Sequence, residues 1–385
     1  MSDKLTCEVL RDDEAWERVR EAWEPLRAVT PDATPWQSWD FLSGWWRSQR
    51  LARRLCLVVV AEAGIPKLIL PLQISRAPRA VALRWLEPVG MPDDVHRPRL
   101  GIGPLDRGAY RLALDRLWGM RQHWDGLRIG ERRPEEADVE ILREFAAERG
   151  ASVRTEPLHP CPYLSLETDW TSYIASRSVR LRKNLRAARR RLDARGPWSL
   201  QRFESVAEVQ EGFALLLQVQ GRSWKAPEGF GLSVSDAYRR FYEVYALGMA
   251  ERGAARILVL RSGARPVAAT LAVTEGDTYY SVMIAHDAEF DACSPGTLLE
   301  ALELEGLMAE RRFRRYDFLG AHLANKRRWT NTAIDTCHLT VLPPGPLAWL
   351  YESWIFEIRP RVRRLPPAAP GRLVTQVGVG AGLAS

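Results

Sequence analysis

The same order of predicted elements occurs twice in the chain, and this repeat constrains the fold more than any other feature. Residues 55–75 and 256–276 each show a strand, a turn that contains Gly and Pro, and a second strand. In each half a helix and a further strand follow, at 105–130 and at 293–320. Because such a helix carries the chain back across a sheet, each half is predicted to form a mixed, mostly antiparallel sheet flanked by helices. The expected fold class is α/β, more closely α+β.

Length and composition fit two domains without a membrane span. The 385 residues exceed one ordinary core, and no run of about eighteen apolar residues is present. The charged N-terminus lacks the apolar core of a secretory signal. Five scattered cysteines favour free thiols in a reducing compartment, so the expected location is the cytoplasm. The cysteines and the six histidines show no metal-ligand spacing, so no metal site is expected.

Positive charge is concentrated in one predicted helix. The chain has a net charge of +7, and residues 177–195 contain nine Lys or Arg against one Asp. Leu181, Leu185, Ala188 and Leu192 form one apolar stripe, so the arginines occupy the other faces. Charge of one sign at this density is costly without a partner. The segment therefore predicts an anionic partner. Arg182 and Arg186 are its candidate substrate-binding residues.

Several motifs of the second half resemble one known family. They are the basic helix, "QGRSW" (220–224), "RPVAATLAV", "SPGTLLEALELEGL" and "YDFLGAHLANKRRW" (316–329). In order and spacing they resemble acyltransferases of the GNAT superfamily, in the CelD-like or BioF-like branch, which is related to the FemAB peptidyltransferases. The first half resembles the degenerate N-terminal GNAT-like domain of the same proteins. The resemblance implies tandem GNAT-like domains, at 1–160 and 161–345, followed by a terminal helix and flexible tail at 346–385.

The segment 293–307 is predicted to open a helix at which an anion can bind. Ser294 is a good N-cap residue, Pro295 suits the first helical position, and Gly296 lets a ligand approach closely. In a GNAT enzyme the donor's pyrophosphate sits on this helix, where first-turn amides are unpaired and the dipole favours an anion. Since the matching helix of the first half begins with the carboxylate of Asp106, only the second half is expected to hold a donor. The resemblance implies that the donor contacts Ser294, Gly296, Thr297 and Leu298.

Further residues are candidates for the chemistry of this site. Asp317 lies at a strand end beside the donor helix, and it could accept the proton of an amine or orient the acceptor. His286 is a second possible proton acceptor, because it follows the strand beside the donor's pantetheine arm. Lys326 could neutralise a donor phosphate or polarise a carbonyl. By the resemblance, Arg222 would bind a carboxylate or phosphate and Trp224 would wall the cleft.

Two acidic segments complete the set of candidates. The loop 87–104 could form a lid or a wall for the acceptor, in which Asp93 or Asp94 would hold an amine. Asp287, Glu289 and Asp291 would repel phosphates if they faced the donor pocket. No Ser/His/Asp arrangement and no nucleophilic cysteine can be picked out, which favours direct attack by the acceptor over an acyl-enzyme.

The sequence therefore predicts an N-acyltransferase that moves an acyl group from a thioester to an amine. Acyl-CoA or acyl carrier protein is favoured over tRNA as donor, because the basic helix offers no aromatic platform for bases. The acceptor, by family analogy, is an amino sugar, an amino acid or a peptide. The alternatives are a FemAB-like aminoacyltransferase that uses charged tRNA and a non-catalytic protein that binds an acidic partner. Residues 347–365 are expected to dock as a helix, with weak membrane-surface contact as the alternative.

Overall fold

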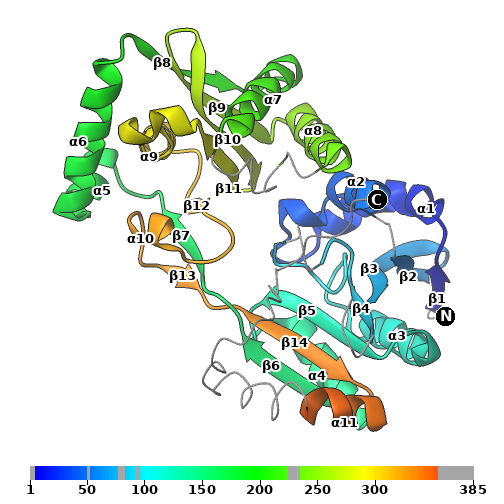
Figure 1. Ribbon diagram of the computed structural model, residues 1–385. Helices are drawn as coiled ribbons and strands as arrows, with labels where there is room; N and C mark the ends of the chain where they lie inside the picture. Colours follow the sequence, from blue (N-terminus) through cyan, green and yellow to red (C-terminus); the bar gives the residue numbers. More distant parts are fainter. Residues whose placement is uncertain are drawn as a thin grey trace, which may run out of the picture. The chain divides into compact units, whose positions relative to one another are not determined.

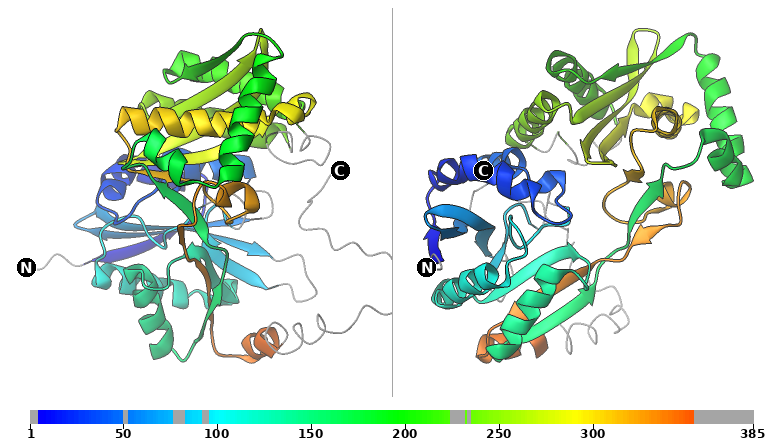
Figure 2. Two further views of the ribbon diagram at one scale, coloured as in Figure 1. Left: turned by 90° about the vertical axis from the view of Figure 1, so that its left-hand side faces the viewer. Right: turned by 180° about the vertical axis from the view of Figure 1, so that it is seen from behind.

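The computed structural model describes residues 5–49, 53–76, 83–91, 96–223, 232 and 235–353, and it contains two seven-stranded sheets (Figures 1 and 2). Residues up to Pro343 form one compact unit, and a second unit begins at Pro344. The second unit contributes one described helix, α11 (Pro346–Glu352). The expected tail and the rest of 347–365 lie outside the described residues.

The first sheet has the strand order β1-β2-β3-β4-β5-β14-β6. Only β4 and β5 pair in parallel, and the other neighbours are antiparallel. A polar N-cap residue starts helix α3 (Arg107–Trp118). The side chain of Asp106 accepts hydrogen bonds from the amides of Gly108 and Ala109. The strands are β1 (Thr6–Leu10), β2 (Arg54–Glu62), β3 (Ile65–Arg76), β4 (Arg84–Pro88), β5 (Gly126–Arg132), β6 (Ser152–Pro157) and β14 (Cys337–Leu342), and the helices are α1 (Ala15–Ala28), α2 (Trp39–Gln49), α3 (Arg107–Trp118) and α4 (Ala137–Glu148).

The second sheet has the strand order β13-β7-β12-β11-β10-β9-β8. Its parallel pair is β11 with β12. Ser178 caps the basic helix α6, and Ser205 forms a capping box with Glu208 at α7. The strands are β7 (Cys161–Ser165), β8 (Trp198–Phe203), β9 (Ala255–Ser262), β10 (Arg265–Glu275), β11 (Thr278–His286), β12 (Arg315–Asp317) and β13 (Ala333–Ile334), and the helices are α5 (Trp170–Ser176), α6 (Val179–Asp193), α7 (Val206–Gly221), α8 (Asp236–Glu251), α9 (Pro295–Glu310) and α10 (Ala324–Arg327).

The two sheets repeat one connection, as the sequence predicts. In the first, a meander of β2, β3 and β4 is followed by α3 and by β5, which lies parallel to β4. In the second, β9, β10 and β11 are followed by α9 and by β12, which lies parallel to β11. The α+β class and the tandem arrangement are therefore confirmed.

The chain passes between the sheets twice. The first passage lies between β6 and β7, inside the proline-rich segment 154–166. The second lies between β13 and β14, and it returns β14 to the first sheet between β5 and β6. The domain boundaries at 160 and 345 stay a prediction, but residues 337–342 belong to the first sheet.

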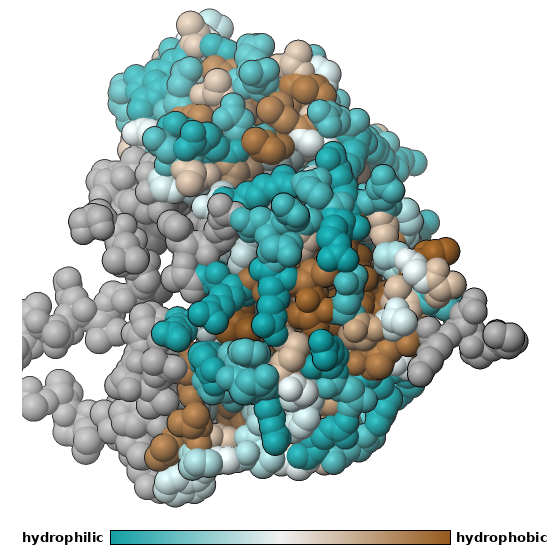
Figure 3. All heavy atoms as spheres, turned by 90° about the vertical axis from the view of Figure 1, so that its right-hand side faces the viewer, coloured by the Kyte–Doolittle hydropathy of each residue, from teal (hydrophilic) through white to brown (hydrophobic). Residues whose placement is uncertain are grey.

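Aromatic side chains join the two halves in one core. Phe41 of α2 packs edge-on against Tyr245 of α8 with ring centroids 4.9 Å apart, and Trp36 packs edge-on against Tyr280 of β11 at 5.3 Å. Each such pair contributes about 0.5–1.5 kcal/mol beyond its buried area. Three tryptophans near this contact, Trp36, Trp39 and Trp46, are all buried. Hydrophobic residues also reach the surface, among hydrophilic ones, on the face to the right in Figure 1 (Figure 3).

No helix among the described residues is long and apolar enough to cross a membrane.

Candidate active site

The start of α9 leaves two backbone amides open. Ser294 has a left-handed backbone (φ 48°), and its side chain makes no capping hydrogen bond, contrary to the sequence-based expectation. The amide of Leu298 donates to the carbonyl of Ser294 at 3.1 Å, so it is already used within the chain. Among the described residues, the amides of Gly296 and Thr297 have no hydrogen-bond acceptor. These two amides form the positive end of the helix dipole.

A ring nitrogen and a guanidinium flank this helix end. A Cβ at position 296 would lie 3.2 Å from Nδ1 of His286, so glycine makes room for the imidazole. Nε2 of His286 lies 2.9 Å from Oδ1 of Asp291. On the other side, Arg328 donates to Oγ1 of Thr297 at 2.8 Å. The sequence motif "NKRRW" contains Arg328, but only the fold brings this cation to the helix end.

The acidic residues before α9 are compensated by cations. Arg265 lies 2.7 Å from both Asp287 and Glu289. Arg222, at the end of α7, lies 3.5 Å from Asp287, so the predicted substrate contact of Arg222 competes with an internal ion pair. The anticipated repulsion of phosphates is therefore reduced. Trp224, Asp93 and Asp94 lie outside the described residues.

Within the part of the chain that the structure describes, strand β11 has an unpaired edge that leads from this helix end into the fold. β11 pairs with β12 only from Thr278 to Tyr280, because β12 ends at Asp317. From Ser281 to His286 the strand pairs with β10 on one side. Backbone groups on the other side are available to an extended ligand, because a strand edge presents a row of donors and acceptors.

Asp317, at the inner end of this edge, is held by two arginines. Its side chain is fully buried, and Arg97 donates to both carboxylate oxygens at 2.7 Å. Arg315 lies 3.4 Å away, and the amide of Leu319 donates to Oδ1 at 3.0 Å. Burial opposes the charged form of Arg97, but the neighbouring Asp317 raises the pKa of this guanidinium above its ordinary value. Both carboxylate oxygens of Asp317 are thus bonded to Arg97, and this ion pair links the two halves.

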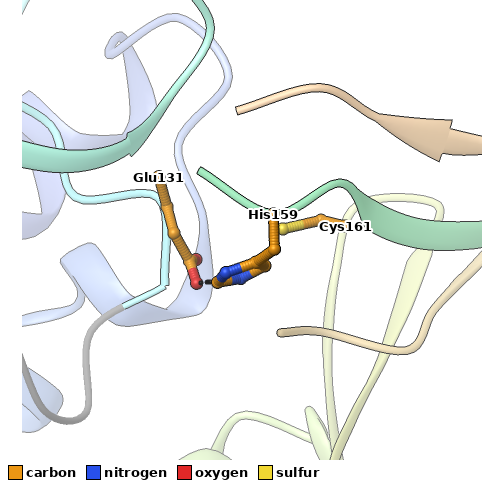
Figure 4. A group of neighbouring side chains, drawn as sticks. All are labelled: Glu131, His159 and Cys161. Carbon is orange, nitrogen blue, oxygen red and sulfur yellow. Dashed lines mark hydrogen bonds and ion pairs between the residues drawn. The ribbon is translucent and has the colours of Figure 1, made fainter. Parts of the chain in front are cut away.

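A second carboxylate, Glu131, is hydrogen-bonded to two histidines nearby. It is the penultimate residue of β5 and has a left-handed backbone (φ 51°). Its carboxylate lies 3.1 Å from Nδ1 of His96. It also lies 3.2 Å from Nε2 of His159 (Figure 4). Burial opposes the ionised form of Glu131, but the hydrogen bonds from His159 and His96 hold its pKa below the ordinary range. Three segments that are distant in sequence form this cluster, which the sequence analysis missed.

The ligand atoms of Glu131, His159 and Cys161 all lie within 4.8 Å of one another (Figure 4). Oxygen, nitrogen and sulfur ligands of this kind could hold a zinc ion. Burial raises the pKa of the Cys161 thiol to about 11. Since this thiol is protonated at neutral pH and Glu131 is satisfied by two imidazoles, the arrangement is complete as a hydrogen-bonded cluster. The predicted absence of a metal stays a prediction.

Lys326 turns inward rather than toward the start of α9. Its ammonium group donates to the carbonyl of Leu319. Burial lowers the pKa of Lys326, while nearby carboxylates and Cys161 oppose this change. Of its two predicted roles, polarising a carbonyl near Asp317 fits this position better than neutralising a phosphate at Gly296.

The basic helix α6 packs against α9 and against the turn that precedes it. Arg191 donates to the carbonyl of Ala292 at 2.8 Å, and Arg195 lies 4.7 Å from the ring centroid of Phe290. The predicted pair Arg182 and Arg186 lies farther along, on a groove between α5, α6 and α9. The structure therefore brings the basic helix to the donor helix, but it places this pair away from Asp317 and the Glu131 cluster.

Comparison with known proteins supports the interpretation of the second half. Residues 179–327 match a family model described as an acetyltransferase (GNAT) domain. No curated protein matches the chain significantly. The fold is similar to that of FemX, with 11% sequence identity, a TM-score of 0.55 and coverage of 87% of this chain and 98% of FemX.

Two further solved structures share the fold. The C-terminal domain of a putative lysylphosphatidylglycerol synthetase from Agrobacterium fabrum is 13% identical, with a TM-score of 0.52 and coverage of 88% of this chain and 95% of the other. L-PGS from Bacillus licheniformis is also 13% identical, with a TM-score of 0.50 and coverage of 88% and 94%. At these identities the likeness shows the fold alone. The family match therefore applies to residues 179–327, which are similar to an acetyltransferase (GNAT) domain, and the structural matches show that the chain as a whole shares the fold of these proteins.

Proposed function

We propose that the protein is an N-acyltransferase that transfers an acyl group from acyl-CoA, or from an acyl carrier protein, to an amine. The observation that carries this proposal is the pair of open amides at Gly296 and Thr297, next to the unpaired edge of β11. A diphosphate would accept hydrogen bonds from both amides, and Arg328 would add a positive charge. The pantetheine arm would then run along residues 281–286 and bring its thioester toward Tyr280 and Asp317.

The proton of the attacking amine needs an acceptor at the inner end of this path. Asp317 is fully buried and its oxygens are taken by Arg97, so we assign it a positioning role. We place the base in the Glu131 cluster, where His96 and His159 are about one-third exposed and bonded to a carboxylate. A carboxylate that orients an imidazole and stabilises its charged form is suited to general-base catalysis.

The reaction then needs no covalent enzyme intermediate. The amine nitrogen attacks the thioester carbonyl, an imidazole of the Glu131 cluster takes the proton, and the thiolate of the donor leaves. Lys326 would polarise the carbonyl. The acceptor would enter between the two halves, where the cluster is exposed, and an amino sugar, an amino acid or a peptide fits this proposal equally.

Calorimetric titration with acetyl-CoA tests the donor site. Gly296→Ala should weaken binding modestly, because its Cβ meets only the His286 ring, whereas Gly296→Trp should abolish binding. Arg328→Gln should weaken binding about tenfold, which corresponds to one charge-assisted hydrogen bond of about 1.4 kcal/mol. The matched control is Arg327→Gln, because Arg327 donates to the carbonyl of His322 instead.

The alternatives give different results in the same experiment. A chain that ignores acetyl-CoA and carrier protein but binds tRNA with a steep salt dependence would be a FemAB-like aminoacyltransferase. A chain that binds none of these ligands would be a non-catalytic accessory protein. Single-turnover assays of His96→Asn and His159→Asn would then identify which imidazole accepts the proton, because only that variant should lose the acidic limb of the pH profile.

A further inference from the structure

The groove between α5, α6 and α9 has a basic rim and an apolar floor. Its volume is about 350 Å³. Figure 1 and the left view of Figure 2 both show α6 beside α9. We propose that this groove binds a single-chain amphiphile with an anionic headgroup, at a site separate from the acyl donor. This inference stands independently of the proposed reaction.

The rim carries positive charge that the protein does not neutralise. Arg182, Arg186 and Arg189 are spaced by four and three residues, so they lie on one face of α6 over about 10 Å. None of the three has an ion-pair partner among the described residues, and the buried Nε of Arg182 has no hydrogen-bond partner. Glu305 is the single acidic residue of the lining, so the rim has an excess of positive charge. An anionic headgroup would form ion pairs with these arginines.

The floor is apolar and continuous with the core. Leu298 and Ala301 of α9 are buried, and Leu185 of α6 and Ile174 of α5 are half-buried. A purely ionic ligand, such as inorganic phosphate, would leave this apolar surface in water. A hydrocarbon chain would cover it, at about 25 cal/mol for each Å² removed from water. A volume near the lower end of the range for ligand pockets fits one chain rather than a two-chain lipid.

The face of α9 that lines the groove is turned away from position 296. Leu298 and Ala301 share a helical face that is turned by roughly half a turn from Gly296 and Glu303. Glu303 marks the sheet-facing side, because its carboxylate accepts hydrogen bonds from Tyr279 and Tyr316, both at 2.7 Å. An amphiphile in the groove therefore contacts the outer face of α9, while the donor would contact its first turn and the edge of β11.

Isothermal titration with dodecyl phosphate below its critical micelle concentration tests the site. We expect saturable one-to-one binding that inorganic phosphate and an uncharged dodecyl glycoside do not reproduce. Arg182→Gln/Arg186→Gln should weaken binding at least tenfold. The matched control, Arg180→Gln/Lys183→Gln, removes the same charge from the same helix at exposed positions outside the groove lining, and it should leave binding unchanged.

A third variant tests the apolar floor. Leu185→Gln should reduce the affinity for dodecyl phosphate more than the affinity for octyl phosphate, because the longer chain covers more of the floor. Circular dichroism melts confirm that each variant is folded. Equal weakening by both double variants would show attraction by net charge alone and would overturn the proposal. Loss of acetyl-CoA binding in Arg182→Gln/Arg186→Gln would assign the groove to the donor and would also overturn it, whereas intact acetyl-CoA binding separates the two sites.

Discussion

Removing Arg97 should destabilise the protein much more than removing Arg84, whose ion pair is more exposed to solvent. Arg97→Met leaves the carboxylate of Asp317 fully buried without its bidentate partner. The matched change is Arg84→Met, since Arg84 binds Asp125, the residue before β5, at 2.7 Å. Both variants lose one guanidinium, but the side chains of the second pair are 33% and 12% exposed.

The structure sets the size of the effect. Breaking a buried ion pair by removing one partner costs about 3–5 kcal/mol. Asp317 keeps Arg315 at 3.4 Å and the Leu319 amide at 3.0 Å, so the lower end, about 3 kcal/mol, is expected. This is about two factors of ten in the folding equilibrium. The partly exposed pair of Arg84 should cost about 1 kcal/mol.

Urea denaturation followed by tryptophan fluorescence and by far-ultraviolet circular dichroism measures both losses. The double variant Arg97→Met/Asp317→Asn should recover most of the stability, because it removes both buried charges. Equal losses for Arg97→Met and Arg84→Met, or a double variant as unstable as Arg97→Met, would refute the reasoning. Asp317→Asn that folds stably but loses turnover without losing acetyl-CoA binding would return Asp317 to the role of base.

Three further outcomes follow from the structure. Burial raises the pKa of Glu300 to about 8, so its folded form keeps a proton that the unfolded form loses, and stability should fall as pH rises from 4.5 to about 8. Glu300→Gln should flatten that dependence in urea titrations at the two ends of the window. Gly103→Ala should cost well over about 1 kcal/mol in the same assay, since φ is +138° and the new Cβ would clash with the carbonyl oxygen of Lys67. Glu131→Gln should abolish turnover while acetyl-CoA affinity changes less than twofold.

The repeated fold could be predicted because its signals are local. Alternating strands and their Gly-Pro turns give the two hairpins, and Asp106 and Ser294 mark the starts of the two crossover helices. The return of β14 to the first sheet could not be predicted in this way. Which of two sheets a short apolar strand joins depends on the edges left open by distant segments, here β5 and β6.

Only the part of the candidate site that a single continuous segment forms could be predicted from the sequence. The open amides of Gly296 and Thr297 follow from the helix start itself, whereas the amide of Leu298 bonds to Ser294 within the turn, which the sequence pattern did not indicate. The Glu131 cluster joins residues far apart in the chain, and no spacing rule relates them. Asp317 was placed at a strand end by its sequence, but its partner Arg97 is 220 residues away, so its occupied state could not be foreseen.

The double passage of the chain between the sheets makes the halves inseparable by a single cut. A fragment that ends near residue 160 would lack β14, and β5 and β6 would face each other across an empty strand position in the middle of the sheet. A fragment that begins there would contain β14 without β5 and β6, so this strand would be unpaired and prone to aggregation. Cleavage near residue 160 would nick the protein without releasing either half, because the connection between β13 and β14 would still join the two sheets.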